Sequence, residues 1–382
     1  MPNEAIAQTS NTLFHVAFVV YILAMVLSFF RLAFTRVSVA GVPTSTSAGR
    51  LIGWVATGLT LGAAIVHGAS VVTRGMAAGG RVPWANMYEY SSLVALIAIV
   101  VGLLVVQRRM GYGHLMGFVL AGAVLLMTSA LLLYDNAAPV QPALNSYWIK
   151  IHTSAAMGAS SIFMVAFAAT ALYLIKDAAE RRVAVTATYD RSTVGAAQLS
   201  DTAVLDGYEV DVESDDAAAP ASAPAQRDAL SPVLFPVVPF VVVGLFTLLV
   251  WRAPTAALIA GSVAALLGTA SWYSVPVLPP AARLDTLAYR VIAFGFPIWT
   301  FAVMAGAIWA EEAWGRYWGW DPKETGSFVT WVLYASYLHA RSTRGWRGRR
   351  AAWIGVVAFG ALMVTYYAVN LWIVGLHSYA RA

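Results

Sequence analysis

The chain has 382 residues, of which 59% are hydrophobic and 11% are charged. Soluble domains carry roughly 25% charged residues, so this composition is typical of a chain that lies mostly in lipid. The absence of cysteine excludes structural disulfides, cysteine-ligated zinc, iron–sulfur clusters and internal thiol catalysis. The pI is about 9.4, but the basic residues gather in short loops between apolar segments, which favours membrane orientation over nucleic-acid binding.

Ten apolar segments are candidates for membrane-spanning helices, because about 20 apolar residues can cross a bilayer as a helix. In chain order they lie at about 13–34, 51–73, 88–107, 113–134, 150–175, 233–251, 255–274, 290–310, 325–340 and 352–374. Pro236 and Pro239 interrupt the sixth segment, so we expect eight to ten spans in an all-α, polytopic integral membrane protein. The preceding residues, MPNEAIAQTSNT, contain no basic residue, and no A-x-A-like site follows the first segment. This pattern predicts a retained helix and not a cleaved signal peptide.

A polar segment separates two membrane regions. Residues 1–175 contain about five predicted spans, and residues 232–382 contain the others. Between them, residues 177–231 hold 11 of the chain's 19 acidic residues and end in a tract of Ala, Pro and Ser. Low hydrophobicity and high acidity disfavour a packed core. We therefore expect residues 176–231 to be a disordered cytoplasmic linker, with a regulatory or docking role as the alternative.

The distribution of basic residues predicts the orientation of the chain. If the N-terminus is outside, the cytoplasmic loops are 31–50, 107–113, 176–231, 275–290 and 341–350. These loops hold 17 of the 24 Lys and Arg residues. The positive-inside rule then predicts that the N-terminus and residues 314–324 lie on the outer face of the plasma membrane.

The stretch WGRYWGWDPKE, residues 314–324, concentrates aromatic rings beside a predicted helix start. Asp321 and Glu324 have the spacing of a capping box, so a helix is expected to begin there. The rings are those of Trp314, Tyr317, Trp318 and Trp320. The first three share one face if the segment before the cap is helical. Two interpretations compete: an aromatic belt at the membrane interface, or a surface that holds a large, flat, apolar ligand.

Two histidines near the same face favour haem as that ligand. In the expected topology His152 begins the fifth span on the outer side, and His377 follows the last span on the same side. Imidazole nitrogen is a common axial ligand of haem iron, and tryptophan rings offer a porphyrin broad apolar contact. Arg316, Lys323 and Arg81 are candidates to bind the haem propionates through charge-assisted hydrogen bonds.

The other four histidines have different expected roles. His339 lies 18 residues beyond Asp321, which is roughly 27 Å along a helix and places it near the inner side. It could bind a second haem, or the same haem on its way out, and His114 at the inner start of the fourth span is a possible partner. His15 and His67 are expected to pack or to form hydrogen bonds.

The aromatic stretch, followed by TWVLYASYLHAR, resembles the tryptophan-rich (WWD) signature of haem-handling proteins. The segments LDTLAYRVIAFGFP at 284–297 and NLWIVGLHSY at 370–379 are similar to those that flank this signature in the CcsA/ResC family, some members of which are called CcsB. That family forms the System II cytochrome c synthase with a ResB-type membrane partner. The residues Asp-Pro-Lys-Glu-Thr differ from the corresponding residues of System I proteins.

The resemblance implies roles for single residues. His152 and His377 match two external histidines that ligate haem b in an outer site, and His339 matches an intramembrane ligand. The histidine opposite His339 would come from the partner protein, in place of His114. Arg81 stands where a segment of the family usually has histidine.

The implied function is to move haem to the outer face and to position it for thioether attachment to a Cys-x-x-Cys-His apocytochrome c. The substrate brings the thiols, which agrees with the lack of cysteine in this chain. A haem exporter without ligation activity, a System I-like haem delivery protein and an electron carrier with a bis-histidine haem are alternatives. Paired histidines at helix ends, beside an aromatic loop, disfavour the electron carrier.

Overall fold

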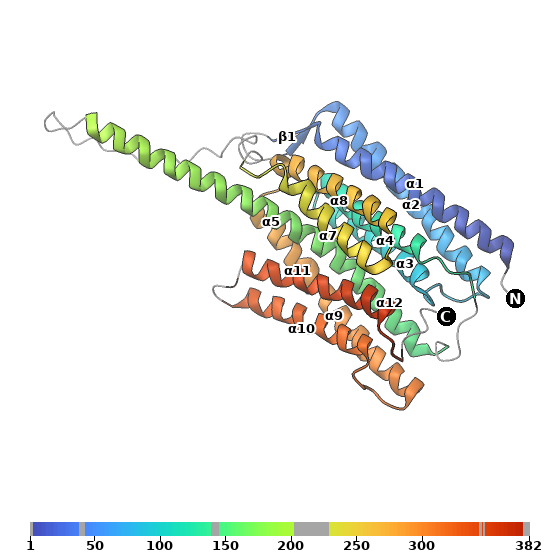
Figure 1. Ribbon diagram of the computed structural model, residues 1–382. Helices are drawn as coiled ribbons and strands as arrows, with labels where there is room; N and C mark the ends of the chain where they lie inside the picture. The colour runs from blue at the N-terminus through green and yellow to red at the C-terminus, as the bar shows by residue number, and fades with distance from the viewer. Residues whose placement is uncertain are drawn as a thin grey trace.

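The computed structural model describes residues 3–37, 43–138, 145–201, 229–343, 346 and 348–376. Nearly all of the described elements are helices (Figure 1). They are α1 (Glu4–Leu32), α2 (Ser47–Ala77), α3 (Met87–Val101), the π-helix η1 (Gly102–Arg109), the 3-10 helix η2 (Gly113–Leu115), α4 (Met116–Leu132), α5 (Tyr147–Asp201), α7 (Leu234–Trp251), α8 (Pro254–Ser274), the 3-10 helix η4 (Val275–Val277), α9 (Ala281–Trp314), α10 (Pro322–Ser342), α11 (Arg349–Val364), the π-helix η5 (Thr365–Val369) and α12 (Asn370–Trp372). The short strands β1 (Thr35–Val37) and β2 (Pro43–Ser45) pair antiparallel between α1 and α2.

Eight helical segments of the described chain are long and apolar enough to cross a membrane. They are Glu4–Leu32, Ser47–Ala77, Met87–Arg109, Gly113–Leu132, Tyr147–Val185, Pro254–Val277, Ala281–Trp314 and Arg349–Trp372. This confirms the prediction of an all-α, polytopic membrane protein. The expected spans at 233–251 and 325–340 are also helical, as α7 and α10, but they fall outside this set. The apolar part of α7 is short, Leu234–Leu249, and α10 is rich in polar side chains.

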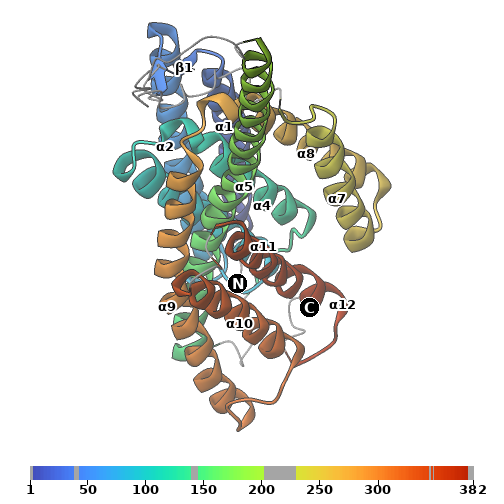
Figure 2. The same ribbon diagram turned by 90° about the vertical axis from the view of Figure 1, so that its left-hand side faces the viewer.

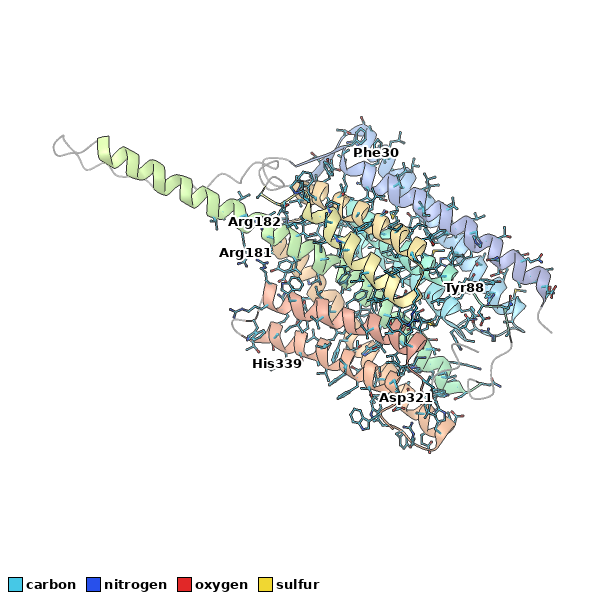
Figure 3. All side chains as sticks on the ribbon, viewed as in Figure 1. Phe30, Tyr88, Arg181, Arg182, Asp321 and His339 are labelled. Carbon is cyan, nitrogen blue, oxygen red and sulfur yellow. The ribbon has the colours of Figure 1, made fainter. Side chains whose placement is uncertain are left out.

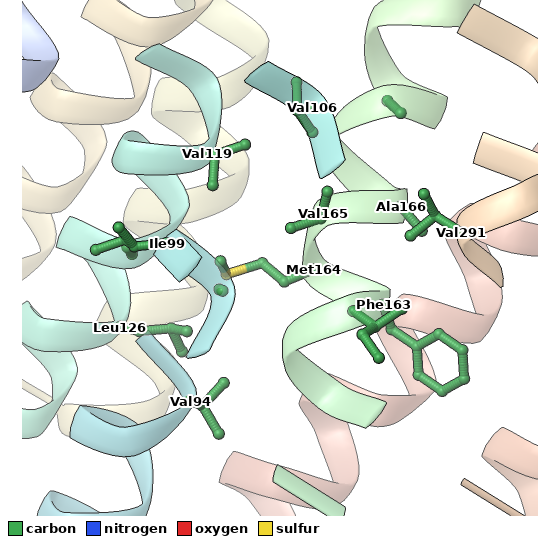
Figure 4. Packing of buried hydrophobic residues seen from close by; sticks show 14 of the residues in the cluster. Val94, Ile99, Val106, Val119, Leu126, Phe163, Met164, Val165, Ala166 and Val291 are labelled. Carbon is green, nitrogen blue, oxygen red and sulfur yellow. The ribbon is translucent and has the colours of Figure 1, made fainter. Parts of the chain in front are cut away.

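The centre of the bundle is formed by α5 and α9, which pack against each other extensively. Small residues permit the close approach: a Cβ on Gly295 of α9 would lie 2.9 Å from Ile162 of α5. On the other side of α5, Met164 points toward Ile99 of α3 and Leu126 of α4 (Figure 4). Such packing is what holds helices together in lipid, where neighbouring helices gain no hydrophobic driving force from leaving water.

The hairpin of α7 and α8 stands at one side of the bundle (Figure 2). Its two helices pack chiefly on each other through glycines, because the Cβ positions of Gly261 and Gly268 are filled by the carbonyl oxygens of the facing helix. Near the base of the hairpin, Lys176 Nζ of α5 donates to the carbonyl of Val275, 2.9 Å away. The hairpin is therefore a compact unit that the bundle holds at that end.

The acidic segment expected to be a disordered linker from residue 176 begins as a helix. α5 continues without a break to Asp201 (Figure 1). Good helix formers and the pair Arg181–Asp177, with Nε and Oδ2 2.8 Å apart, support this extension. Residues 202–228 lie outside the described residues.

One end of the bundle gathers the segments that the sequence predicts on the outer side. The start of α5, the end of α9 and the start of α10 lie there, and so does the N-terminus of α1 (Figure 1). The strands β1 and β2 and the long extension of α5 lie at the opposite end. We call the first of these the tryptophan end, after residues 314–320.

Candidate functional site

The tryptophan loop, residues 315–321, connects α9 to α10 and is not helical. Gly315 ends α9 in the left-handed conformation with φ of 69°, and Trp320 has φ of 59°. A helix cannot continue through these angles. One shared face for Trp314, Tyr317 and Trp318 was expected only if this segment is helical, and that condition is not met.

Two carboxylates hold the tryptophan loop in place. Asp321 Oδ1 accepts a hydrogen bond from Lys323 N at 3.1 Å, and Glu324 Oε2 accepts from Asp321 N at 3.1 Å. These bonds confirm the predicted capping box at the start of α10. Glu324 Oε2 also accepts from Gly319 N at 2.8 Å, and Arg316 Nη1 lies 3.6 Å from Glu324 Oε1. The helix cap and the loop therefore form one hydrogen-bonded unit.

The aromatic rings of the loop divide into two groups. Trp318 and Trp320 make an edge contact with ring centroids 5.7 Å apart, and both contact Phe328 of α10. Trp314 instead packs against the buried Trp309 of α9, with centroids 4.8 Å apart, and carries Arg316 over its ring. Of these rings, Trp318 lines the cavity described below, whereas Trp314, the last residue of α9, packs on its own helix beside the loop.

A largely apolar cavity of about 970 Å³ lies between the bundle helices, with α7 and α8 along one side. Cavities that bind organic ligands commonly have volumes of about 300–1,000 Å³. Tyr317, Trp318 and Lys323 line its tryptophan end. Along α5 the cavity extends from Ile149 to Phe167, which is roughly 27 Å of helix. It is therefore deep enough to reach well into the membrane-spanning part of the bundle.

His152 lies in the cavity wall with one ring nitrogen already engaged. Its Nδ1 is 2.7 Å from the carbonyl oxygen of Ala302 on α9, and a carbonyl can only accept, so Nδ1 carries the proton. Nε2 then has the free lone pair that a metal ligand needs. Histidine ligands of metals commonly have their other nitrogen fixed in this way. Gly306 makes room for the ring, because a Cβ there would lie 2.7 Å from His152 Nδ1.

The charged groups at the tryptophan end of the cavity are few. Lys323 is the basic residue in the described wall, beside the carboxylate of Glu324. The indole Nε1 of Trp318 is buried and has no hydrogen-bond partner among the described residues. An ammonium group and an unused N–H donor in an apolar wall suit an anionic group on an otherwise apolar ligand.

Several of the residues expected at the site lie elsewhere. Trp314 at the end of α9 and the loop residues Arg316, Trp320 and Asp321 are not part of the cavity wall. His339 is exposed on α10, at the opposite end of that helix from Asp321 (Figure 3). His377 lies outside the described residues.

The cluster around Glu89 gives Arg81 a different role from propionate binding. Arg81 Nη1 is 2.7 Å from Glu89 Oε2, and Arg74 Nε is 2.9 Å from Glu89 Oε1, with all three side chains largely buried. Arg81 therefore fixes the start of α3. His67 is also internal, with Nε2 2.9 Å from Ser92 Oγ, which agrees with a hydrogen-bonding role.

The sequence reasoning missed a wall of tyrosines. Tyr366 and Tyr367 lie on the π-helix η5 and line the cavity together with Tyr90 of α3. Tyr366 stacks on Tyr90 with centroids 5.2 Å apart and forms a hydrogen bond with Ser91. Tyr367 donates to Ser129 Oγ at 2.7 Å. The paired tyrosines in TYYAV were the available signal, but nothing in the sequence shows the π-helical turn that directs both toward the cavity.

Sequence comparisons match most of the chain to known proteins. The family model described as cytochrome C assembly protein matches residues 84–377. The cytochrome c biogenesis protein CcsA of Rippkaea orientalis is 31% identical over 383 residues, which cover 97% of each chain. The protein of the same name from Picosynechococcus sp. is 31% identical over 331 residues, or 85% of this chain and 88% of that one. The one from Synechococcus elongatus is 58% identical over 99 residues, or 26% of this chain and 30% of that one.

Proposed function

Because this chain belongs to the cytochrome c assembly protein family, we propose that it presents haem b for covalent attachment to apocytochrome c, as the haem-handling subunit of a System II cytochrome c synthase. Its role is in cytochrome c maturation, and it is a multi-pass membrane protein. Haem is the substrate in this proposal, and the lipid bilayer surrounds the site. The partners are a ResB-type membrane protein and the apocytochrome.

The position of His152 carries the proposal. A histidine whose Nδ1 is held by the Ala302 carbonyl lies in the wall of a deep apolar cavity, and Trp318 lines the same cavity. In this account His152 Nε2 binds the haem iron, while Trp318 and Tyr317 contact the macrocycle. Lys323 and the Trp318 N–H bind a propionate. The remaining residues of the tryptophan loop keep these groups in place.

The second axial ligand in the outer site is proposed to be His377. The histidine of the incoming Cys-x-x-Cys-His segment would replace one of the two protein ligands, which releases the product. His339 would act at an inner site. Ionisable side chains within a membrane normally face a partner group, and His339 is exposed on α10, so the group opposite it would come from the partner protein.

In the proposed reaction the protein contributes by positioning the haem vinyl groups and the cysteine thiols. Each cysteine thiol of the apocytochrome adds across a vinyl double bond of haem: the S–C bond forms, the π bond is lost, and the hydrogen moves to the neighbouring carbon. The addition involves no net oxidation or reduction. Holding the two groups in a reactive geometry can contribute roughly 7–11 kcal/mol in favourable cases.

The outer face of the plasma membrane is the proposed location of the site. The loops at the end opposite the tryptophan loop belong to the set that holds 17 of the 24 basic residues, which supports a cytoplasmic location for that end. Haem exporters and synthases have the same need for a haem site, so export without ligation is the alternative.

Reconstitution tests the proposal. The chain would be co-expressed with a ResB-type partner and an exported Cys-x-x-Cys-His reporter, in a host that lacks its own cytochrome c maturation proteins. We expect covalent haem on the reporter, seen as haem that stays bound in a denaturing gel. Haem that reaches the outer compartment while the reporter stays unmodified would support the exporter instead.

A further inference from the structure

The chain that follows α12 returns to the start of α10. The backbone N–H of Leu376 donates to Asp321 Oδ2 at 2.7 Å. The other oxygen of the same carboxylate, Oδ1, accepts from Lys323 N at 3.1 Å. Asp321 therefore links two backbone segments that are 55 residues apart in the sequence.

Gly375 makes this contact possible. A Cβ on Gly375 would lie 2.5 Å from Asp321 Oδ2 and 3.1 Å from Cδ of Pro322. Any larger residue would push the segment away from the helix start. Gly375 does not have a positive φ. Glycine is therefore needed here because a Cβ would not fit, and not because of the backbone conformation.

The carboxylate is well suited to hold the segment. Asp321 is buried, with 7% of its surface exposed, and lies at the N-terminus of α10, where the helix dipole favours a negative charge. Hydrogen bonds to an ionised acceptor are roughly twice as strong as those between neutral groups. Glu324 accepts hydrogen bonds from the N–H groups of Gly319 and Asp321, whereas Asp321 accepts the hydrogen bond from Leu376.

We propose that Asp321 is a positioning residue for the second haem ligand. Asp321, Gly375 and Leu376 form a C-terminal latch, which holds the chain at the residue before His377. Consecutive Cα atoms are about 3.8 Å apart, so a group that holds Leu376 acts on its direct neighbour in the chain. This inference rests on the proposed function, in which His377 binds the haem iron. It gives Asp321 a role even though its side chain is outside the cavity wall.

Two variants test the latch, one at the carboxylate that accepts the hydrogen bond and one at the glycine that packs against it. Asp321→Asn keeps a good N-cap residue, but with its oxygen on Lys323 N it directs an amide NH₂ toward the Leu376 N–H. Gly375→Ala leaves Asp321 intact and adds the Cβ that the contact cannot hold. Gly360→Ala is the matched control, because its Cβ would meet nothing within 4 Å.

The readout is covalent haem on the reporter, with and without added imidazole. We expect Asp321→Asn and Gly375→Ala to lose about tenfold in yield, and Gly360→Ala to lose none. Imidazole should restore both to the level that it gives His377→Ala, because it fills the same coordination position. The double variant Asp321→Asn/His377→Ala should be no worse than His377→Ala alone.

The outcomes separate the latch from the proposed function. If imidazole rescues His377→Ala, but Asp321→Asn and Gly375→Ala are fully active or are not rescued, the latch is overturned and the ligand assignment stands. If His377→Ala itself retains full yield, the assignment of His377 as a ligand fails, and the latch fails with it.

Discussion

Gly306 is the residue that lets an imidazole lie between α5 and α9. With no side chain there, His152 can place Nδ1 on the Ala302 carbonyl, which leaves the proton off Nε2. The ring is held by a backbone carbonyl and by the packing of two helices. Small shifts of the backbone at this point would therefore move the imidazole directly.

Gly306→Ala should displace His152 without removing it. The new Cβ would lie 2.7 Å from Nδ1, which is closer than such atoms pack, so the ring must move. A misplacement of about 1 Å can cost up to a hundredfold in a positioned reaction, so we expect holocytochrome yield to fall roughly ten- to a hundredfold. The control is Gly158→Ala on α5, whose Cβ would meet nothing within 4 Å. Equal yields from the two variants would contradict the role given to Gly306.

For single residues, the sequence predicted the local capping hydrogen bonds, but it did not predict which aromatic side chains line the cavity. The capping box of Asp321 and Glu324 follows from local spacing alone, and the structure has it. Which aromatic residues reach the cavity could not be predicted, because left-handed backbone at Gly315 and Trp320 breaks the helical periodicity on which the expectation depended. The bond between Asp321 and Leu376 joins residues too distant in sequence for any local pattern to show.

Among the elements, the α7–α8 hairpin depends most clearly on close backbone contact. A Cβ on Gly268 would overlap the carbonyl oxygen of Phe235, and one on Gly261 would lie 2.9 Å from that of Phe240. The hairpin forms one side of the cavity through Phe246 and other apolar residues. The sequence predicts both helices from their apolar length, but it does not show that they line the site.

Gly268→Ala should separate the two helices of the hairpin. Overpacking of this kind typically costs about 1–3 kcal/mol, occasionally more, so we expect a lower midpoint of thermal unfolding in detergent. Cleavage by protease near the turn at Arg252 should also become faster. Gly62→Ala on α2 is the control, because nothing lies within 4 Å of its Cβ. An unchanged midpoint for Gly268→Ala would show that the hairpin tolerates a wider spacing.

For the whole molecule, composition predicted the class of protein, which the structure confirms, whereas the orientation predicted from charge stays a prediction. Long apolar segments give helices in lipid because each backbone N–H and C=O must bond within its own segment. The sequence does not predict which helices pack against each other. The packing of α5 on α9, and of α1 on α4, joins distant parts of the chain and depends on side-chain fit, which hydropathy does not encode.

Orientation can be tested with single cysteines, because the chain has none of its own. Glu311 lies exposed near the end of α9, and Ser342 lies exposed at the other end of α10. We expect Glu311→Cys to react with a membrane-impermeant maleimide in intact cells. Ser342→Cys should react only after the membrane is opened. The reverse pattern would place the tryptophan loop in the cytoplasm and contradict the outer site.

The most direct test of the account is the yield of covalent haem on the reporter for His152→Ala, measured with and without imidazole. We expect less than about a tenth of the normal yield without imidazole and a partial recovery with it, since free imidazole can replace the missing ligand. His15→Ala should behave normally, because His15 is exposed and bonds only to Asn11 of its own helix in the described structure. Normal yield from His152→Ala without imidazole would contradict the central claim that His152 holds haem for attachment.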